Sequence, residues 1–313
     1  MVLEKIKLME SLSNLLCSSI EAALLAGQKV SEIYNNDFEV YYKNDQSPVT
    51  EADIESNKII QDVLKEYKLP FLSEESDLIP FDIRKAWEYY WLIDPIDGTK
   101  EFINRNDEFT INIALIKKNQ PIIGVVYSPM KSELYFGSSI GFSKKIKINV
   151  SEINNLNIEE LISDGIKLPL EKKRDNYIVL TSRSHLNPKT LNYIDLLKIN
   201  NPNFKIIKMG SSLKICKIAG GEADIYPRFG PTKEWDTAAG HAVLKYSGGN
   251  LLNENVDELI YNKKDIKNPN FIASFNIYKT LKKWKNNYSK LNPMFLIIIK
   301  KKLGNWMIPI IFF

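Results

Sequence analysis

The sequence predicts a layered protein in which an α+β section is followed by an α/β section. In the first section, two stretches with apolar residues at helical spacing precede four short apolar runs typical of strands. In the second section, strand-like and helix-like segments alternate between residues 177 and 246. Such alternation is typical of a sheet packed between helices, so we expect a three-layer sandwich there.

Two helices are expected at the start of the chain. The first spans about residues 11–34, where apolar residues such as Leu16 and Ile20 recur on one helical face. The second opens at Thr50, and Asp53 stands three residues later, as in a capping box. Four strands follow, at residues 89–93, 110–116, 122–127 and 133–136, and the turn at 119–121 indicates an antiparallel meander.

A polar stretch from Phe142 to about Lys173 is interpreted as a boundary that carries a peripheral hairpin. Beyond it we expect strands at 177–181, 205–208, 223–226 and 271–274, and helices at 188–198, 211–219 and 237–246. The sequence thus suggests three parts: an N-terminal α+β domain (1–140), a C-terminal α/β domain (141–276) and a tail (277–313).

The basic character of the chain belongs to that tail. The formal net charge is +4, yet residues 277–313 hold eight lysines and no acid, so the rest of the chain carries −4. A nucleic-acid-binding domain is therefore not indicated. Cys17 and Cys216 offer neither a disulfide framework nor metal-ligand spacing, which favours a reducing, cytoplasmic compartment.

The most informative segment is the end of the strand predicted at 89–93. Asp94 and Asp97 follow this buried run directly; Pro95 is expected to stop strand pairing, and Gly98 permits a tight turn. Two unpaired carboxylates so close together would repel each other, and a cation between them is the simplest resolution. Taken alone, the segment is equally compatible with an Asx turn that binds no metal.

Three further acidic segments could also contribute to a cation site, and each has a local alternative. Glu74 and Glu75 follow a short apolar run, but they could lie in a solvated loop. Asp53 could serve only in the capping box. Asp236 could simply cap the helix expected to begin at Thr237.

Together these segments resemble the inositol monophosphatase superfamily of metal-dependent, lithium-sensitive phosphatases. Both superfamily signatures are present in order, Asp-Pro-Ile-Asp-Gly-Thr at 94–99 and Trp-Asp-x-Ala-Ala-Gly at 235–240. The Lys100-Glu101-Phe102 extension is similar to the bacterial 3'(2'),5'-bisphosphate nucleotidase (CysQ) family, as are the segments 43–50, 182–185, 210–214 and 226–232. The resemblance covers roughly residues 20–276 and implies an αβαβα sandwich.

The resemblance also implies a centre of two or three Mg²⁺ ions held by oxygen ligands. The implied ligands are Glu74, Asp94, the Ile96 carbonyl, Asp97 and Asp236. In such a centre Asp53 holds the Thr99 hydroxyl, and this pair acts with Glu74 to orient and deprotonate the attacking water. Backbone N–H groups after Gly98 suit the phosphate oxygens.

Substrate selection is expected from the second section, because a nucleotide with two phosphates needs donors for the group that is not cleaved. The resemblance points to Ser184, His185, Gly210, Ser212, Lys214 and Arg228, with Gly98, Thr99 and Asp236 also at the substrate. Lys214 could instead be a surface lysine, and Arg228 could pair with a structural carboxylate. His241 is interpreted as structural.

The implied activity is removal of the 3'-phosphate from adenosine 3',5'-bisphosphate, with activity on 3'-phosphoadenylyl sulfate and a place in sulfur assimilation. The alternatives are an inositol or sugar monophosphatase and an inactive nucleotide- or lithium-binding regulator.

Neither apolar run of the tail, 295–299 or 306–313, approaches the ~20 residues of a spanning helix. With its lysines the tail suits peripheral contact with the inner face of the cell membrane, and an extension without function is the alternative. The sequence does not indicate an oligomeric state.

Overall fold

The computed structural model describes residues 2–43, 46–170, 175–184, 186–199, 201 and 203–275. The tail expected at 277–313 and the candidate residue His185 lie outside these ranges. Within them, no helix combines the length and the apolar character needed to cross a membrane.

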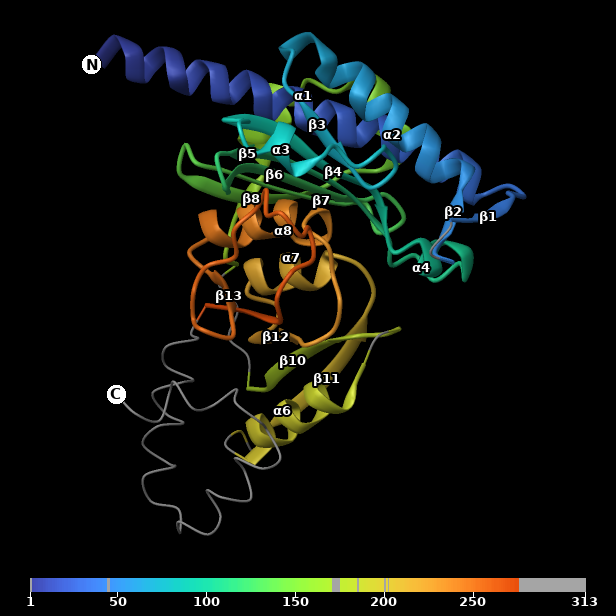
Figure 1. Cartoon of the computed structure of the whole chain (residues 1–313), viewed down its shortest axis with the longest axis vertical. Coiled ribbons are helices and arrows are strands. Elements are labelled where there is room, and N and C mark those ends of the chain that lie inside the picture. The colour runs from blue at the N-terminus through green and yellow to red at the C-terminus, as the bar shows by residue number, and fades with distance from the viewer. Residues whose placement is uncertain are drawn as a thin grey trace.

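Five layers of alternating helices and sheets build the molecule, as Figure 1 shows from top to bottom. The outer helices α1 (Val2–Tyr34) and α2 (Glu51–Leu64) cover one face of a seven-stranded sheet. Helices α7 (Leu213–Ala219) and α8 (Trp235–Tyr246) lie between that sheet and a five-stranded one. Helix α6 (Pro188–Ile199) covers the far face of the second sheet. The expected αβαβα sandwich is confirmed.

The seven-stranded sheet has the order β3-β4-β5-β6-β7-β8-β9. Its strands are β3 (Phe71–Ser73), β4 (Tyr89–Asp97), β5 (Thr110–Lys117), β6 (Gln120–Ser128), β7 (Glu133–Ser138), β8 (Phe142–Lys147) and β9 (Ile166–Lys167). Strands β3 and β4 are parallel and all later neighbours are antiparallel, so the expected meander is confirmed.

The five-stranded sheet has the order β11-β10-β12-β14-β13. Its strands are β10 (Tyr177–Ser182), β11 (Phe204–Met209), β12 (Ile225–Arg228), β13 (Asn250–Asn253) and β14 (Phe271–Ser274). Smaller elements are the hairpin β1 (Val40–Tyr42) and β2 (Pro48–Thr50), the short helices α3 (Phe81–Arg84), α4 (Thr99–Ile103) and α5 (Ile158–Asp164), and the 3₁₀ turns Lys65–Tyr67 and Val150–Asn155.

Both faces of the first sheet are buried, which explains why its strands read as continuous apolar runs. In β5, Ile111 and Ile113 face the core under α1, whereas Ala114 and Ile116 face the core formed with α7 and α8. Strand β4 alternates in the same way. The ends of the central strands are therefore fixed by packing on two sides.

Three expectations need correction. Strand β4 does not stop at Ile93: it continues to Asp97, with a register shift between Asp94 and Asp97 where Pro95 interrupts the ladder. Helix α1 begins well before residue 11, at Val2. The stretch after Phe142 is less peripheral than expected, because β8 and β9 extend the first sheet. The division into domains at residue 140 stays a prediction.

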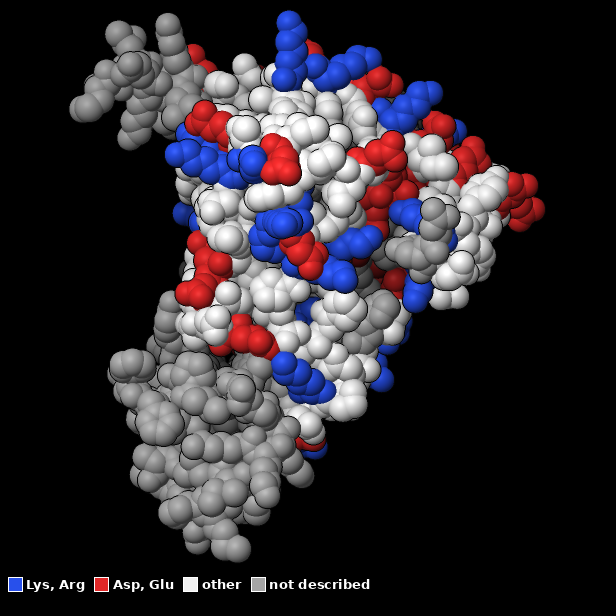
Figure 2. All heavy atoms as spheres, viewed as in Figure 1, with Lys and Arg blue, Asp and Glu red and all other residues white. Residues whose placement is uncertain are grey.

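Outer helices of the sandwich carry charges of both signs. Figure 2 shows Lys and Arg side chains interspersed with Asp and Glu over α1 and α2, so the described part of this face presents no extended basic surface.

Close contact between α8 and the first sheet gives a testable prediction. A Cβ added to Gly124 in β6 would lie 2.3 Å from the Ala239 carbonyl oxygen and 2.6 Å from Ala242 Cβ. We expect Gly124→Ala to lower the free energy of unfolding by about 1–3 kcal/mol, the usual effect of overpacking. Urea denaturation measures it. Gly230→Ala is the control, because its added Cβ has no neighbour closer than 3.4 Å; equal losses in both variants would contradict the packing argument.

Candidate metal centre and active site

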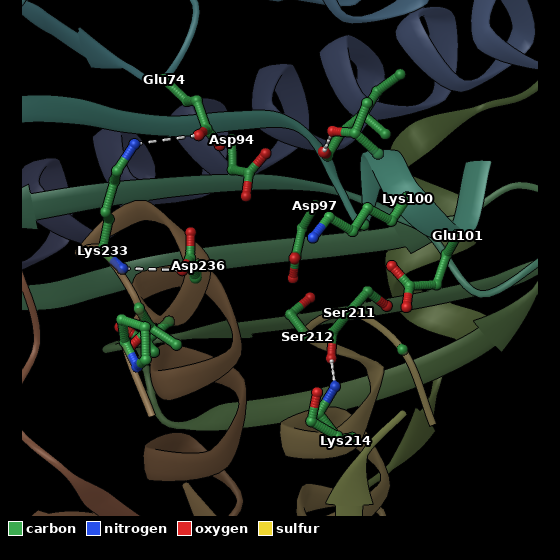
Figure 3. Close-up of a pocket in the computed structure, with 18 of the residues that line it drawn as sticks. Glu74, Asp94, Asp97, Lys100, Glu101, Ser211, Ser212, Lys214, Lys233 and Asp236 are labelled. Carbon is green, nitrogen blue, oxygen red and sulfur yellow. Dashed lines mark hydrogen bonds and ion pairs between the residues drawn. The ribbon is translucent and has the colours of Figure 1, made fainter. Parts of the chain in front are cut away.

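Three carboxylates from separate elements meet at the end of β4. Asp94 lies on β4, Glu74 directly follows the parallel strand β3, and Asp236 lies in the first turn of α8. One oxygen of each lies within 4.8 Å of the others (Figure 3). The backbone N–H of Glu74 donates to the Ile93 carbonyl at 3.2 Å, which places Glu74 beside the strand that carries Asp94.

The electrostatics of this group call for a cation. Asp94 is only 1% exposed, and its Oδ1 has no hydrogen-bond partner among the described residues. Burial, reinforced by Glu74 and Asp97, raises the pKa of Asp94 well above its ordinary value. Burial and then Asp97 also raise the pKa of Asp236. Buried carboxylates with free oxygens, placed against one another, fit a hard divalent cation.

Asp97 and Ile96 line the same cavity as these three acids. Burial raises the pKa of Asp97 to about 6, although the Lys214 ammonium opposes this shift. The Asp97 carboxylate accepts from Asn112 Nδ2 at 3.4 Å, and the Ile96 carbonyl accepts from Thr99 Oγ1 at 3.4 Å. The structure therefore brings all five predicted ligand residues to one place, with Asp97 outside the tightest group of three.

Asp53 fulfils both roles that its sequence position allowed. One carboxylate oxygen accepts from the Thr50 backbone N–H at 2.8 Å, the Asp53 half of a capping box. The other oxygen accepts from Thr99 Oγ1 at 3.3 Å. Burial raises the pKa of Asp53 to about 6, and the bonds from Thr50 act in the opposite direction. Gly98, with φ of +99°, makes the turn that brings Thr99 to Asp53.

The local alternatives for the other acids are wrong. Helix α8 begins at Trp235 with Glu234 at the N-cap, so Asp236 lies inside the first turn and caps nothing. Its carboxylate instead accepts from the Lys233 backbone N–H at 2.8 Å. Glu74 lies in the turn after β3, but its side chain is only 23% exposed: it lines the cavity and faces the Lys233 ammonium at 3.5 Å.

A cavity of about 580 Å³ extends from the acids to two buried cations, Lys214 on α7 and Arg228 on β12. Lys214 is 4% exposed, and its Nζ donates to the carbonyl oxygens of Met209 at 3.1 Å and Ser211 at 2.5 Å. It also lies over the Tyr226 ring at 5.3 Å. The alternative of a surface lysine is therefore wrong. Burial lowers the pKa of Lys214 to about 8, with Asp97 opposing and Arg228 reinforcing the shift.

Arg228 is the second of these cations. It is 7% exposed, donates from one terminal nitrogen to the Pro231 carbonyl at 3.0 Å, and leaves its Nε without a partner. No carboxylate in the described part of the chain forms an ion pair with it, so the structural alternative finds no support there. A buried guanidinium with an unused donor in a cavity wall is suited to an anionic group.

Not all of the other residues predicted to bind the substrate lie at the cavity. Gly210 and Ser212 line the cavity. Ser184 is exposed, does not line the cavity and donates to Glu101 Oε1 at 2.7 Å. His241 is fully buried between the Tyr261 hydroxyl at 2.9 Å and Glu258 at 3.0 Å, in agreement with the structural role expected for it.

Sequence reasoning missed several residues at the site. Asn112 is the clearest case: it is 1% exposed and bonds both Asp97 and the Ser212 hydroxyl, the latter at 2.8 Å. A polar residue inside the apolar run of β5 was a signal that could have found it. Ser182, Lys233 and Glu101 also line the cavity. Lys233 lies two residues before the signature at 235–240, and this position could have indicated that it belongs to the site.

Comparisons with known proteins agree with this geometry. A model of the inositol monophosphatase family matches residues 11–290. The 3'(2'),5'-bisphosphate nucleotidase CysQ of Escherichia coli strain K12 is 38% identical over 254 residues, covering 80% of this chain and 95% of that protein. The enzyme of the same name from Buchnera aphidicola is 38% identical over 263 residues, covering 80% and 89%.

A solved structure is similar over most of its length. The crystal structure of CysQ from Bacteroides thetaiotaomicron, a bacterial member of the inositol monophosphatase family, has a TM-score of 0.76 and 42% identity. The match covers 84% of this chain and 97% of that one. An inositol monophosphatase from Anabaena shares the fold at 21% identity, with a TM-score of 0.62 and coverage of 85% and 92%.

Repulsion at the acid cluster predicts that one substitution stabilises the metal-free protein. Because the pKa of Asp94 is raised in the fold above its ordinary 3.8, its ionisation destabilises the folded state as pH rises from about 4 through the folded pKa. We expect Asp94→Asn to increase the free energy of unfolding at pH 7 by about 1 kcal/mol or more, since a tenfold change in an acid's ionisation constant corresponds to about 1.4 kcal/mol. The gain disappears below about pH 4, where Asp94 is protonated in both states.

Thermal and urea unfolding in the presence of a chelator, at pH 4 and pH 7, measures this effect. The control is Asp62→Asn on α2, an exposed carboxylate paired with Lys65 at 2.8 Å. It should change little at either pH. A less stable Asp94→Asn variant at pH 7 would contradict the interpretation.

Proposed function

The chain belongs to the inositol monophosphatase family, and from that premise we propose that it is a Mg²⁺-dependent 3'(2'),5'-bisphosphate nucleotidase. It hydrolyses the 3'-phosphate of adenosine 3',5'-bisphosphate to give AMP and phosphate. The names of the relatives from Escherichia coli and Buchnera aphidicola support the activity. The all-oxygen donor set at the end of β4 supports Mg²⁺, and the number of ions, two or three, stays a prediction.

One observation carries the choice of substrate: the cavity has an acidic end and a basic end. The carboxylates Glu74, Asp94 and Asp236 occupy one end, and the buried cations Lys214 and Arg228 line the other. A phosphate held at the end with the carboxylates would leave the two cations available to a second anionic group. An inositol monophosphate has no second anionic group to pair with Lys214 and Arg228.

Each residue has a defined part in the proposed reaction. When bound, Mg²⁺ supplies a water of lowered pKa and stabilises charge on the leaving oxygen. The residues that would hold the ions are Glu74, Asp94, Ile96 through its carbonyl, Asp97 and Asp236. Thr99, fixed by Asp53, orients the attacking water, and Glu74 accepts its proton. The water oxygen bonds to phosphorus, the bond from phosphorus to the 3'-oxygen breaks, and that oxygen takes up a proton.

The substrate groups are held by the remaining residues of the cavity. Backbone N–H groups after Gly98 and at Thr99 bind the phosphate that is cleaved, while Asp236 lies beside the substrate as well as the metal. Lys214 and Arg228 bind the other phosphate, with Gly210 and Ser212 contacting the same part of the nucleotide. Ser184 and His185 stay predictions: Ser184 is engaged by Glu101, and His185 lies outside the described residues.

Narrower parts of the proposal are activity on 3'-phosphoadenylyl sulfate, a role in sulfur metabolism, inhibition by lithium and a cytoplasmic location. Peripheral contact of the tail with the cell membrane stays a prediction that the described residues do not address.

A panel of substrates tests the function. We expect phosphate release from adenosine 3',5'-bisphosphate to exceed that from inositol monophosphate and fructose bisphosphate by at least about 10-fold in kcat/KM, and to require Mg²⁺. Preference for inositol or sugar phosphates would support a monophosphatase. Absence of turnover on every substrate, with nucleotide binding retained, would support a regulator.

Lys214 provides a sharper prediction within that panel. Lys214→Met keeps the length of the side chain and removes its charge. A hydrogen bond to a charged group is worth about 1.5–3 kcal/mol, so kcat/KM for adenosine 3',5'-bisphosphate should fall about 10- to 100-fold. The same variant assayed on adenosine 3'-monophosphate is the control and should change far less. Equal losses on the two substrates would show that Lys214 has a structural role.

A further inference from the structure

The turn Gly210–Ser212, which leads into α7, forms one wall of the cavity and requires restraint from outside. Ser211 has φ of +45°, in the left-handed region that disfavours residues other than glycine. Its carbonyl accepts from the Lys214 ammonium, so the shape of the turn decides where that charge lies. A strained backbone of this kind persists only where neighbouring structure fixes it.

The segment from α4 to β5 supplies that restraint by direct packing. A Cβ added to Gly210 would lie 2.6 Å from Glu101 Cγ and 2.7 Å from the Glu108 carbonyl oxygen. The turn is thus pressed against the connection between α4 and β5, which follows the phosphate-binding turn at Gly98. Only glycine allows the approach, so Gly210 serves the contact as well as the substrate.

A single carboxylate reinforces the contact. Glu108 Oε2 accepts from the Gly210 backbone N–H at 2.8 Å and from Arg183 Nε at 2.9 Å, and its Oε1 accepts from an Arg183 terminal nitrogen at 2.8 Å. That terminal nitrogen also donates to the Lys208 carbonyl at 3.3 Å. Glu108 therefore joins the end of β10, the end of β11 and the turn to the connection between α4 and β5.

The geometry makes this pair stronger than an ordinary surface ion pair. The Glu108 side chain is 11% exposed, and the Arg183 side chain is 44% exposed. Burial alone would raise the pKa of Glu108, but the Arg183 guanidinium and the Gly210 N–H hold it below its ordinary value. The pair is bidentate, and its loss would leave the buried N–H of Gly210 without a partner.

Neither partner lines the cavity, whereas Gly210, Ser211, Ser212 and Lys214 do. We propose that Glu108, held by Arg183, is a positioning residue that fixes the turn 210–214 and so determines affinity for the second phosphate of the substrate. This role rests on the proposed function. It is separate from the metal centre, because β3, β4 and α8 carry the acids there.

The turn has a second anchor that should survive loss of the first. Ser212 Oγ donates to Asn112 Oδ1 at 2.8 Å and lies 2.9 Å from Thr110 Oγ1. Removing the Glu108 carboxylate therefore loosens the Gly210 end of the turn while Ser212 stays attached. We expect weaker binding of the second phosphate and an intact metal centre.

The experiment compares Glu108→Gln with the wild type on two substrates, adenosine 3',5'-bisphosphate and adenosine 3'-monophosphate. The variant keeps the shape of the side chain but loses its charge and one acceptor. KM for the bisphosphate should rise about 5- to 20-fold with kcat within about 2-fold, and KM for the monophosphate should stay within about 2-fold. Arg183→Gln should reproduce this pattern, and the double variant should be no worse than either single variant.

Two further variants complete the design. Glu254→Gln removes an ion pair with Lys189 at 2.8 Å, remote from the cavity lining, and should change neither KM. Arg183→Lys retains charge but not the bidentate geometry, so it should show a smaller rise in KM for the bisphosphate. Because Arg183 is the more exposed partner, this variant also serves if Glu108→Gln unfolds at the assay temperature.

The outcomes separate the positioning role from the proposed function. A wild type that prefers the bisphosphate, with Glu108→Gln and Arg183→Lys changing both substrates equally or changing kcat alone, would overturn the positioning role only. A wild type that does not prefer the bisphosphate would overturn the proposed function and the role together. A selective rise in KM for the bisphosphate, absent in Glu254→Gln, supports the role.

Discussion

Mutual repulsion of buried carboxylates at the end of β4 is the constraint on which the rest of the structure depends. Asp94 is almost completely buried, has an oxygen without a partner among the described residues, and faces Glu74, Asp97 and Asp236. Nothing in these side chains favours their approach in the absence of a cation. The apolar packing of the elements that carry them must therefore bring them together and hold them there.

That packing comes from both sides of the first sheet. Trp91 and Ile93 of β4 point into the core under α1 and α2, while Tyr90 and Leu92 point into the core shared with α7 and α8. Strand β4 is consequently fixed up to the irregularity at Pro95, where the chain turns its carboxylates toward the cavity. Asp236 arrives from α8, which lies so close to β6 that Gly124 has no room for a side chain. Stability gained in the two cores thus offsets the repulsion at the site.

Sequence patterns predicted these parts of the molecule because the relevant signals are local. Apolar runs bounded by turns indicated most strands, and the family resemblance carried by the segments around Glu74, Asp94, Asp97 and Asp236 implied the metal centre. Contacts between residues far apart in the chain have no local sequence signal of this kind. Asn112 and Ser212 are one hundred residues apart, and Glu108 and Gly210 are slightly further apart, so no spacing rule connects them. The sequence also did not predict the burial of Lys214, because a lysine in the first turn of an amphipathic helix usually points to solvent.

The contacts that the sequence did not reveal are those that join the two ends of the cavity. Asp97 lines the cavity with the other carboxylates and is close enough to Lys214 to be affected by its charge, and Asn112 bonds to both Asp97 and Ser212. Glu108 makes a second connection, from the segment before β5 to the turn at Gly210. In the proposed function the acidic end performs hydrolysis and the basic end selects the substrate, so these connections set the separation between the two phosphate sites. A fold with a fixed metal centre can then change its substrate through the turn 210–214 and its supports, while the carboxylates at β4 stay as they are.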